Sequence, residues 1–201
     1  MKNIELCVRP ALPYDKWKRA LQMTGSSIVG LDMKTEEAVE FRKAVGAQIS
    51  CFLRGARETE ASLPVIECLT LDEALKVKRP PLILRVSASA SEEQLDAFLK
   101  RYPNRVAVLE ISGAEMRSLY EEGRQEMFGN VVRLARVASA KRVPPAISSD
   151  AQDTSQLITS MGRSALMNLL MGRDEACGGL LQRRAADRLL RALITQEGGS
   201  F

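Results

Sequence analysis

The chain has 201 residues, of which 45% are hydrophobic and 27% are charged, and its formal net charge is +4. This length and composition are typical of one globular domain that buries its own core. The sequence contains no histidine. The missing imidazole excludes Ser-His-Asp catalysis, Cys-His catalysis and the usual histidine-based metal sites.

Short apolar runs, widely spaced cysteines and few aromatic residues exclude further classes of function. No apolar run approaches the roughly 20 residues of a membrane span, and the first five residues carry no apolar signal core. We therefore expect a cytoplasmic protein with no membrane partner. The four cysteines have no CxxC spacing, which favours small buried side chains over a zinc knuckle or redox motif. With five Phe, three Tyr and one Trp, any contact to RNA is expected through its backbone rather than by base stacking.

Strand and helix patterns take turns along the chain. Strand patterns occupy residues 4–8, 27–31, 49–53, 65–68, 82–86, 105–111 and 145–149. Helix patterns occupy residues 14–23, the segment from Thr35, a turn after Thr70, the segment after Ser91, residues 115–140 with interruptions near Gly123 and Gly129, and the chain from about Gly162 onward. Thr70 and Ser91 each stand three residues before a Glu or Gln, the spacing of a capping box.

This alternation predicts an α/β fold with parallel strands. Seven strand patterns without a long linker favour a closed or nearly closed parallel barrel. We expect it to form a single domain over residues 1–201, ending in a helical segment from about residue 162. A doubly wound open sheet is the alternative, and the lack of a Gly-rich phosphate loop weighs against it.

Polar side chains follow most of the strand patterns. In a parallel barrel the functional residues gather at the C-terminal ends of the strands. The residues found there are Arg9, Asp32, Arg54, Ser87, Glu110, Ser149 and Asp150. Ser149 and Asp150 fit a ligand-binding edge, and they equally fit a strand end whose side chains bond loose backbone groups. Glu110 and Asp150 as a carboxylate pair would suit a small-molecule lyase or isomerase, or a Mg²⁺ site.

Basic residues form two further clusters. Lys141 and Arg142 stand just before the seventh strand pattern. Arg184, Arg188 and Arg191 recur at i, i+4 and i+7, which places them on one stripe of the C-terminal helix beside an apolar stripe. The stripe is either a solvated helix face or a contact to RNA phosphates, for which the donor fork of arginine is well suited.

The segment 104–170 resembles the archaeal ribonuclease P protein component 3 family, the homologues of the eukaryotic p-thirty protein subunit. The resemblance is carried by residues 105–111, 130–135, 145–151, 156–157 and 166–170, and by residues 6–10 and 25–30 nearer the N-terminus. The turn at 158–163 departs from the family, because it lacks the proline and the acidic residue that often follow the Ser-Asp strand.

The resemblance implies a TIM-barrel-like, histidine-free relative of the phosphoesterase barrels without their metal site. It also implies a non-catalytic subunit of ribonuclease P, the ribonucleoprotein that removes the 5′ leader from precursor tRNA. The RNA would carry the chemistry with Mg²⁺, and this chain would bind no cofactor. The implied partners are the ribonuclease P RNA, a small α/β ribonuclease P protein subunit and the other ribonuclease P protein subunits.

On this basis we expect no catalytic and no metal-ligating residue in the chain. The residues expected to face RNA or a partner protein are Arg9, Arg54, Lys141, Arg142, Arg184, Arg188 and Arg191, with Ser149 and Asp150 marking the strand-end motif.

Overall fold

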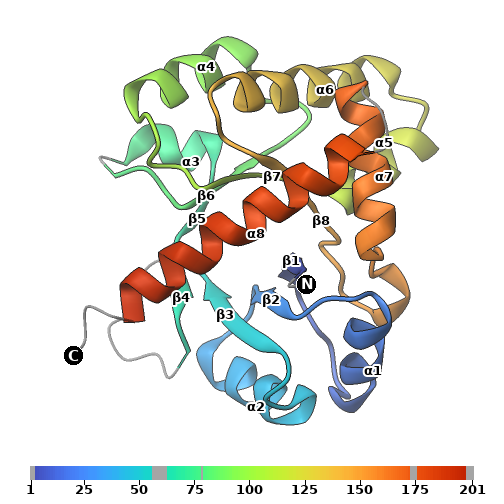
Figure 1. Cartoon of the computed structure of the whole chain (residues 1–201). Coiled ribbons are helices and arrows are strands. Elements are labelled where there is room, and N and C mark those ends of the chain that lie inside the picture. Colours follow the sequence, from blue (N-terminus) through green and yellow to red (C-terminus); the bar gives the residue numbers. More distant parts are fainter. Residues whose placement is uncertain (1–2, 56–62, 78, 173–175, 198–201) are drawn as a thin grey trace.

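The computed structural model describes residues 3–55, 63–77, 79–172 and 176–197 (Figure 1). Its elements in chain order are β1 (Ile4–Val8), α1 (Asp15–Met23), β2 (Ile28–Leu31), α2 (Thr35–Val45), β3 (Ser50–Arg54), β4 (Val65–Ile66), β5 (Cys68–Thr70), α3 (Leu71–Lys76), β6 (Ile83–Val86), α4 (Glu92–Arg101), β7 (Val108–Ser112), α5 (Gly113–Glu121), α6 (Gln125–Ala140), β8 (Pro145–Ser148), the 3₁₀ turn η1 (Thr154–Gln156), α7 (Ser160–Met171) and α8 (Ala176–Glu197). The alternation of strands and helices predicted from the sequence is confirmed.

The strands form two parallel sheets. One sheet has the order β1-β2-β3-β4 and the other has the order β5-β6-β7-β8. Neither has the reversal of strand order that defines a doubly wound sheet, so that alternative does not fit the described strands. Only Glu67 separates β4 from β5, so the chain passes directly from one sheet to the other. A parallel bridge joins Val8, the last residue of β1, to Ala151 beyond β8. This arrangement is consistent with a barrel-like α/β fold.

Four elements differ from the sequence prediction in their bounds or continuity. The fourth strand pattern is divided between β4 and β5, and the sixth begins only at Val108. The long helix is broken at Gly123, whose φ of +68° suits glycine, but it continues through Gly129 inside α6. The C-terminal helical segment begins at Ser160 and consists of two helices separated at Gly172, which has a φ of +59°.

Side-chain caps stand at both predicted helix starts, but only the cap at Thr70 is a complete capping box. Thr70 and Glu73 form a complete capping box at α3. Ser91 caps α4 by accepting a hydrogen bond from the backbone N–H of Gln94 at 3.3 Å. Each cap satisfies backbone donors that a helix leaves unpaired at its N-terminus, so the sequence signal has a local physical cause.

The interior of the first sheet is packed so tightly that it requires a glycine. A Cβ atom at Gly30 in β2 would lie 2.2 Å from the carbonyl oxygen of Leu6 and 2.6 Å from the ring of Phe52. The Phe52 ring occupies the space that a side chain at position 30 would need. Gly30 thus allows β1, β2 and β3 to approach one another around this ring.

Helix α8 covers the N-terminal end of the strands, and Figure 1 shows it crossing in front of them. Ala185 and Leu189 of α8 are fully buried and share one apolar cluster with the first residues of several strands, among them Ile4 and Ile28. One face of α8 therefore belongs to the core. Its opposite face is available for other contacts.

Candidate functional site

A buried ion pair joins Arg54, the last residue of β3, to Glu110, which was predicted at a strand end but lies in the middle of β7. The guanidinium of Arg54 donates to both carboxylate oxygens of Glu110, with Nη1–Oε1 at 2.8 Å and Nη2–Oε2 at 2.6 Å. It also donates to the carbonyl oxygen of Leu6 at 2.5 Å and to Cys68 Sγ at 2.9 Å. The side chains of Arg54 and Glu110 are 4% and 0% exposed. Arg54 was predicted to face RNA or a partner, yet its charge is directed into the protein.

The ion pair keeps Glu110 ionised. Burial alone would raise the pKa of this carboxyl, but the adjacent Arg54 and, at greater range, Arg85 favour the charged form, and the pKa lies below its ordinary value. Burial raises the pKa of the neighbouring Cys68 thiol to about 12. At neutral pH the site thus holds a carboxylate and an uncharged thiol.

Asp150 is held in a second set of contacts beside this pair. Arg85 of β6 forms a salt bridge with Asp150 Oδ2, and Ser112 Oγ donates to the same oxygen at 3.0 Å. Cys7 Sγ lies 3.3 Å from Oδ1. Burial raises and Arg85 lowers the pKa of Asp150, and the net result is a pKa below its ordinary value. The sequence analysis missed Arg85, although a charged residue within an otherwise apolar strand pattern was a usable signal.

Arg9 joins the cluster at the surface. Its Nε donates to Asp32 Oδ2 at 2.8 Å, and its Nη2 lies 3.5 Å from Asp150 Oδ1. The side chains of Arg9 and Asp32 are 39% and 42% exposed, so this pair remains accessible to water. Of the basic residues predicted at strand ends, Arg9 is the one with an accessible charge.

These contacts bear on the lyase or isomerase alternative. A general acid or base needs a pKa near the working pH and access to the proton that it moves. Glu110 and Asp150 have lowered pKa values and are each bound to a guanidinium. The geometry therefore gives no support to acid–base chemistry by this pair.

Among the residues that the structure describes, no three His, Cys, Asp or Glu side chains are grouped so that they could hold a metal ion.

Ser149 connects β8 to β1 through a buried carboxylate. Glu5 accepts hydrogen bonds from the backbone N–H of Ser149 at 2.8 Å and from its Oγ at 2.5 Å. Arg163 of α7 donates to the same carboxylate at 2.5 Å, and both charged side chains are at most 2% exposed. Ser149 Oγ also accepts from the N–H of Ile158 at 2.8 Å. The Ser-Asp strand end is thus used to join elements, and the sequence analysis missed both Glu5 and Arg163.

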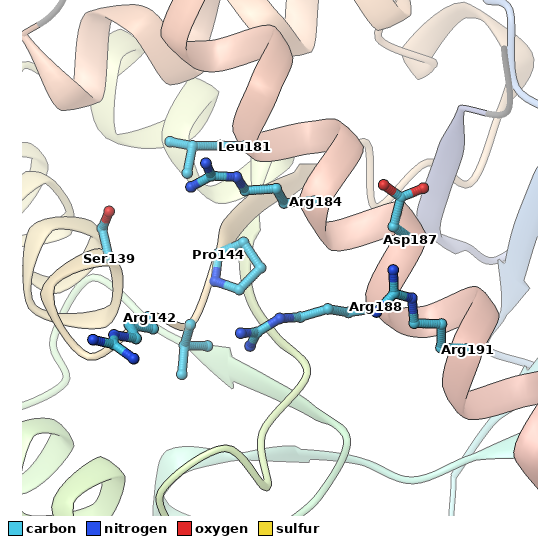
Figure 2. Close-up of a pocket in the computed structure, with 9 residues that line it drawn as sticks. Ser139, Arg142, Pro144, Leu181, Arg184, Asp187, Arg188 and Arg191 are labelled. Carbon is cyan, nitrogen blue, oxygen red and sulfur yellow. The ribbon is translucent and has the colours of Figure 1, made fainter.

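A basic groove lies on the opposite face of the molecule, between α8 and the turn that joins α6 to β8. It has a volume of about 500 Å³. Its lining consists of Ser139, Arg142, Val143, Pro144, Leu181, Arg184, Asp187, Arg188 and Arg191. Figure 2 shows Arg184 and Arg188 extending from α8 toward Pro144 and the turn that carries Arg142, while the Asp187 carboxylate points away from them and Arg191 lies farther along the helix. Four of the predicted site residues meet here.

The predicted pair Lys141 and Arg142 is divided. Arg142 has a φ of +62° and lines the groove, whereas Lys141 forms a salt bridge to Asp96 of α4 at 3.0 Å. The left-handed backbone at Arg142 turns the two neighbouring side chains to different sides. Although Lys141 and Arg142 are adjacent in the sequence, they therefore do not lie on the same surface.

The comparisons with known proteins add one finding about the fold. No family model and no curated protein matches the chain. A chain in the cryo-EM structure of archaeal ribonuclease P with mature tRNA has a similar structure, with a TM-score of 0.65 and 12% sequence identity. The match covers 96% of this chain and 91% of that chain. The two chains share a fold over nearly their whole lengths.

None of the described helices is both long enough and apolar enough to cross a membrane.

Proposed function

We propose that this chain is a protein subunit of ribonuclease P and belongs to its protein component 3 family. The observation that carries the proposal is the fold shared with a chain of archaeal ribonuclease P, since it extends over 96% of this chain and 91% of that one. A likeness of this extent leaves no large extra element on either side that would indicate a different use of the fold.

The strand ends support a role without catalysis by the chain itself. Barrel enzymes react at the C-terminal ends of their strands. Here Arg54, Arg85 and Arg9 neutralise Glu110 and Asp150 at that end, so the charged groups serve the protein's own structure. In the proposal the sheets close into one TIM-barrel-like domain, and the RNA with its bound Mg²⁺ carries out the cleavage.

The proposed partners are the ribonuclease P RNA, the small α/β subunit and the other protein subunits. The protein contributes positive charge that reduces repulsion between RNA phosphates and fixes the geometry of the RNA. We propose that the protein is localised in the cytoplasm.

The test is purification of the tagged chain from its native cells under mild conditions. The co-purified RNA is sequenced, and the eluate is assayed for cleavage of a precursor tRNA at its mature 5′ end. We expect one structured RNA to be enriched and the eluate to cleave the precursor. Treatment of the eluate with micrococcal nuclease before the assay should abolish cleavage, because the RNA carries the chemistry.

The control is a mock eluate prepared in the same way from cells that carry the untagged chain, which separates specific cleavage from contaminating nuclease. An eluate that contains the chain but neither an enriched RNA nor cleavage activity would refute the proposal. Cleavage that survives nuclease treatment would also refute it, because the activity would then belong to a protein.

A further inference from the structure

We propose that the groove between α8 and the α6–β8 turn binds the sugar-phosphate backbone of double-helical RNA without reading its base sequence. This inference deepens the proposed function and rests on it for the identity of the natural RNA. The binding chemistry itself follows from the groove and can be tested with any RNA duplex.

The two available arginines of α8 lie close enough to contact neighbouring phosphates of one duplex strand. Arg184 and Arg188 are four residues apart on α8, which is about 6 Å along the helix axis. One strand of a duplex carries a phosphate about every 3.4 Å along its axis, so about two phosphates lie opposite this stretch. Arg142 faces α8 across the groove and supplies a donor from the other side.

The positive charge of the groove is not balanced by the protein. Four arginines and one aspartate line it. In the part of the chain that the structure describes, no ion pair joins Arg142, Arg184 or Arg188 to a carboxylate. Arg191 already has an interaction within the protein, so it is not counted among the available donors. Unpaired guanidinium groups that converge on one groove are suited to phosphate, whose oxygens match their fork of donors.

The rest of the lining argues for backbone contact rather than for bases or a protein partner. None of the described residues that line the groove is aromatic, so they offer no platform on which unpaired bases would stack. Protein–protein interfaces concentrate aromatic residues, methionine and arginine at their centre, and of these the described lining contains arginine alone. Besides the charged residues the groove presents one hydroxyl, on Ser139, which is too little to distinguish bases.

The experiment measures binding of the purified full chain to a fluorescent RNA hairpin by anisotropy, with two hairpins of unrelated stem sequence. Three phosphate contacts predict a slope of about −2.7 for the logarithm of affinity against the logarithm of salt concentration. Between about 50 and about 200 mM KCl this corresponds to a loss of affinity of about 40-fold. Both hairpins should bind with the same affinity.

The test variant is the triple substitution Arg142→Gln, Arg184→Gln and Arg188→Gln. Removal of three phosphate contacts should bring the salt slope close to zero and abolish the hairpin binding seen at low salt. The control is Arg19→Gln, Arg42→Gln and Arg117→Gln, which removes the same charge from exposed positions on α1, α2 and α5. It should keep the wild-type slope.

A second variant separates charge from geometry and guards against misfolding. This variant is Arg142→Lys, Arg184→Lys and Arg188→Lys. Its salt slope should persist while its affinity for the hairpin falls several-fold, because lysine lacks the donor fork of arginine. Thermal unfolding of every variant confirms that each is folded.

The outcomes distinguish this proposal from the ribonuclease P assignment. Equal losses in the test and control variants would refute the groove, since net charge alone would then explain binding. Wild-type protein that fails to bind either hairpin would refute it as well and would leave an acidic protein as the occupant of the groove. If the groove binds hairpins as described but no RNA co-purifies from cells, the inference stands and the ribonuclease P role fails.

Discussion

The substitution Glu110→Gln tests the interpretation that the charged strand ends hold the fold together. Arg54 makes four short contacts inside the protein, and two of them go to the Glu110 carboxylate. Glutamine keeps the shape of the side chain but removes its charge. The guanidinium, whose side chain is 4% exposed, is then left buried without a counter-charge.

Breaking a buried ion pair from one side costs about 3–5 kcal/mol of unfolding free energy. For a chain of this size that corresponds to a fall in Tm of about 6–20 °C. The assay is urea unfolding and thermal unfolding of the isolated protein followed by circular dichroism. The double variant Arg54→Met with Glu110→Leu should recover most of the loss, because it removes both buried charges together.

Asp32→Asn is the matched control for this experiment. It breaks the Arg9–Asp32 pair, whose side chains are 39% and 42% exposed, and should cost no more than about 1 kcal/mol. If Glu110→Gln unfolds at the same urea concentration as the wild type, the ion pair contributes nothing and the reasoning is wrong. A variant that keeps full stability but loses a turnover reaction would instead favour the lyase or isomerase alternative.

The pH dependence of the same variant follows from the lowered pKa of Glu110. Its ordinary value is 4.5, and the folded state holds it lower because the attraction of Arg54 outweighs burial. The stability that the carboxylate contributes is complete above pH 4.5 and is lost as the pH falls through the folded-state value. The difference in unfolding free energy between wild type and Glu110→Gln should therefore shrink on acidification below that pH. A constant difference down to acid unfolding would contradict this.

Three further predictions concern the packing and the remaining charges. Gly30→Ala should reduce the unfolding free energy by at least about 1–3 kcal/mol, because the added Cβ meets backbone and a buried ring. Gly129→Ala, where the nearest atom lies at 3.8 Å, should instead raise the unfolding free energy by about 0.5–1 kcal/mol. Urea unfolding of the two variants measures both changes. Arg163→Met should cost about 3–5 kcal/mol by leaving the Glu5 carboxylate buried without its cation, and hydrogen exchange should increase along β1 and β8 first; unchanged exchange there would contradict it. Asp150→Asn should flatten the loss of stability on acidification below pH 3.8, the ordinary pKa that the folded protein lowers, and an unaltered acid-unfolding curve would count against the contact with Arg85.

Local signals predicted the elements of the fold well because their causes are local. The capping box at Thr70 and the left-handed glycine at Gly123 act within a few residues, and both are found where the sequence places them. Gly129 was predicted to interrupt the helix, yet α6 continues through it, because an isolated glycine costs a helix only about 1 kcal/mol relative to alanine. The start of β7 at Val108 depends on its pairing with β6, which no local pattern contains.

The charged site was predicted only in part, because Arg85, Glu5 and Arg163 were missed and the connections between its members were not predicted. Glu110 and Asp150 were expected near one another, and Arg54 was expected to face a partner. The pairing of each carboxylate with an arginine from another strand depends on contacts 56 and 65 residues apart in the chain. Spacing along the sequence carries no information on such pairs. The basic stripe of α8, by contrast, lies on one helix, and its helical periodicity was sufficient to predict it.

Helix α8 combines two roles, since Ala185 and Leu189 complete the core while Arg184 and Arg188 line the basic groove. Occupation of the groove by RNA would therefore hold in place the helix that closes one end of the strands. At a free RNA concentration 100 times the dissociation constant, such linkage adds about 2.7 kcal/mol to the stability of the fold. Protein made in excess of its RNA would then be the form most open to proteolysis, and degradation of that surplus would match the amount of protein to the amount of RNA.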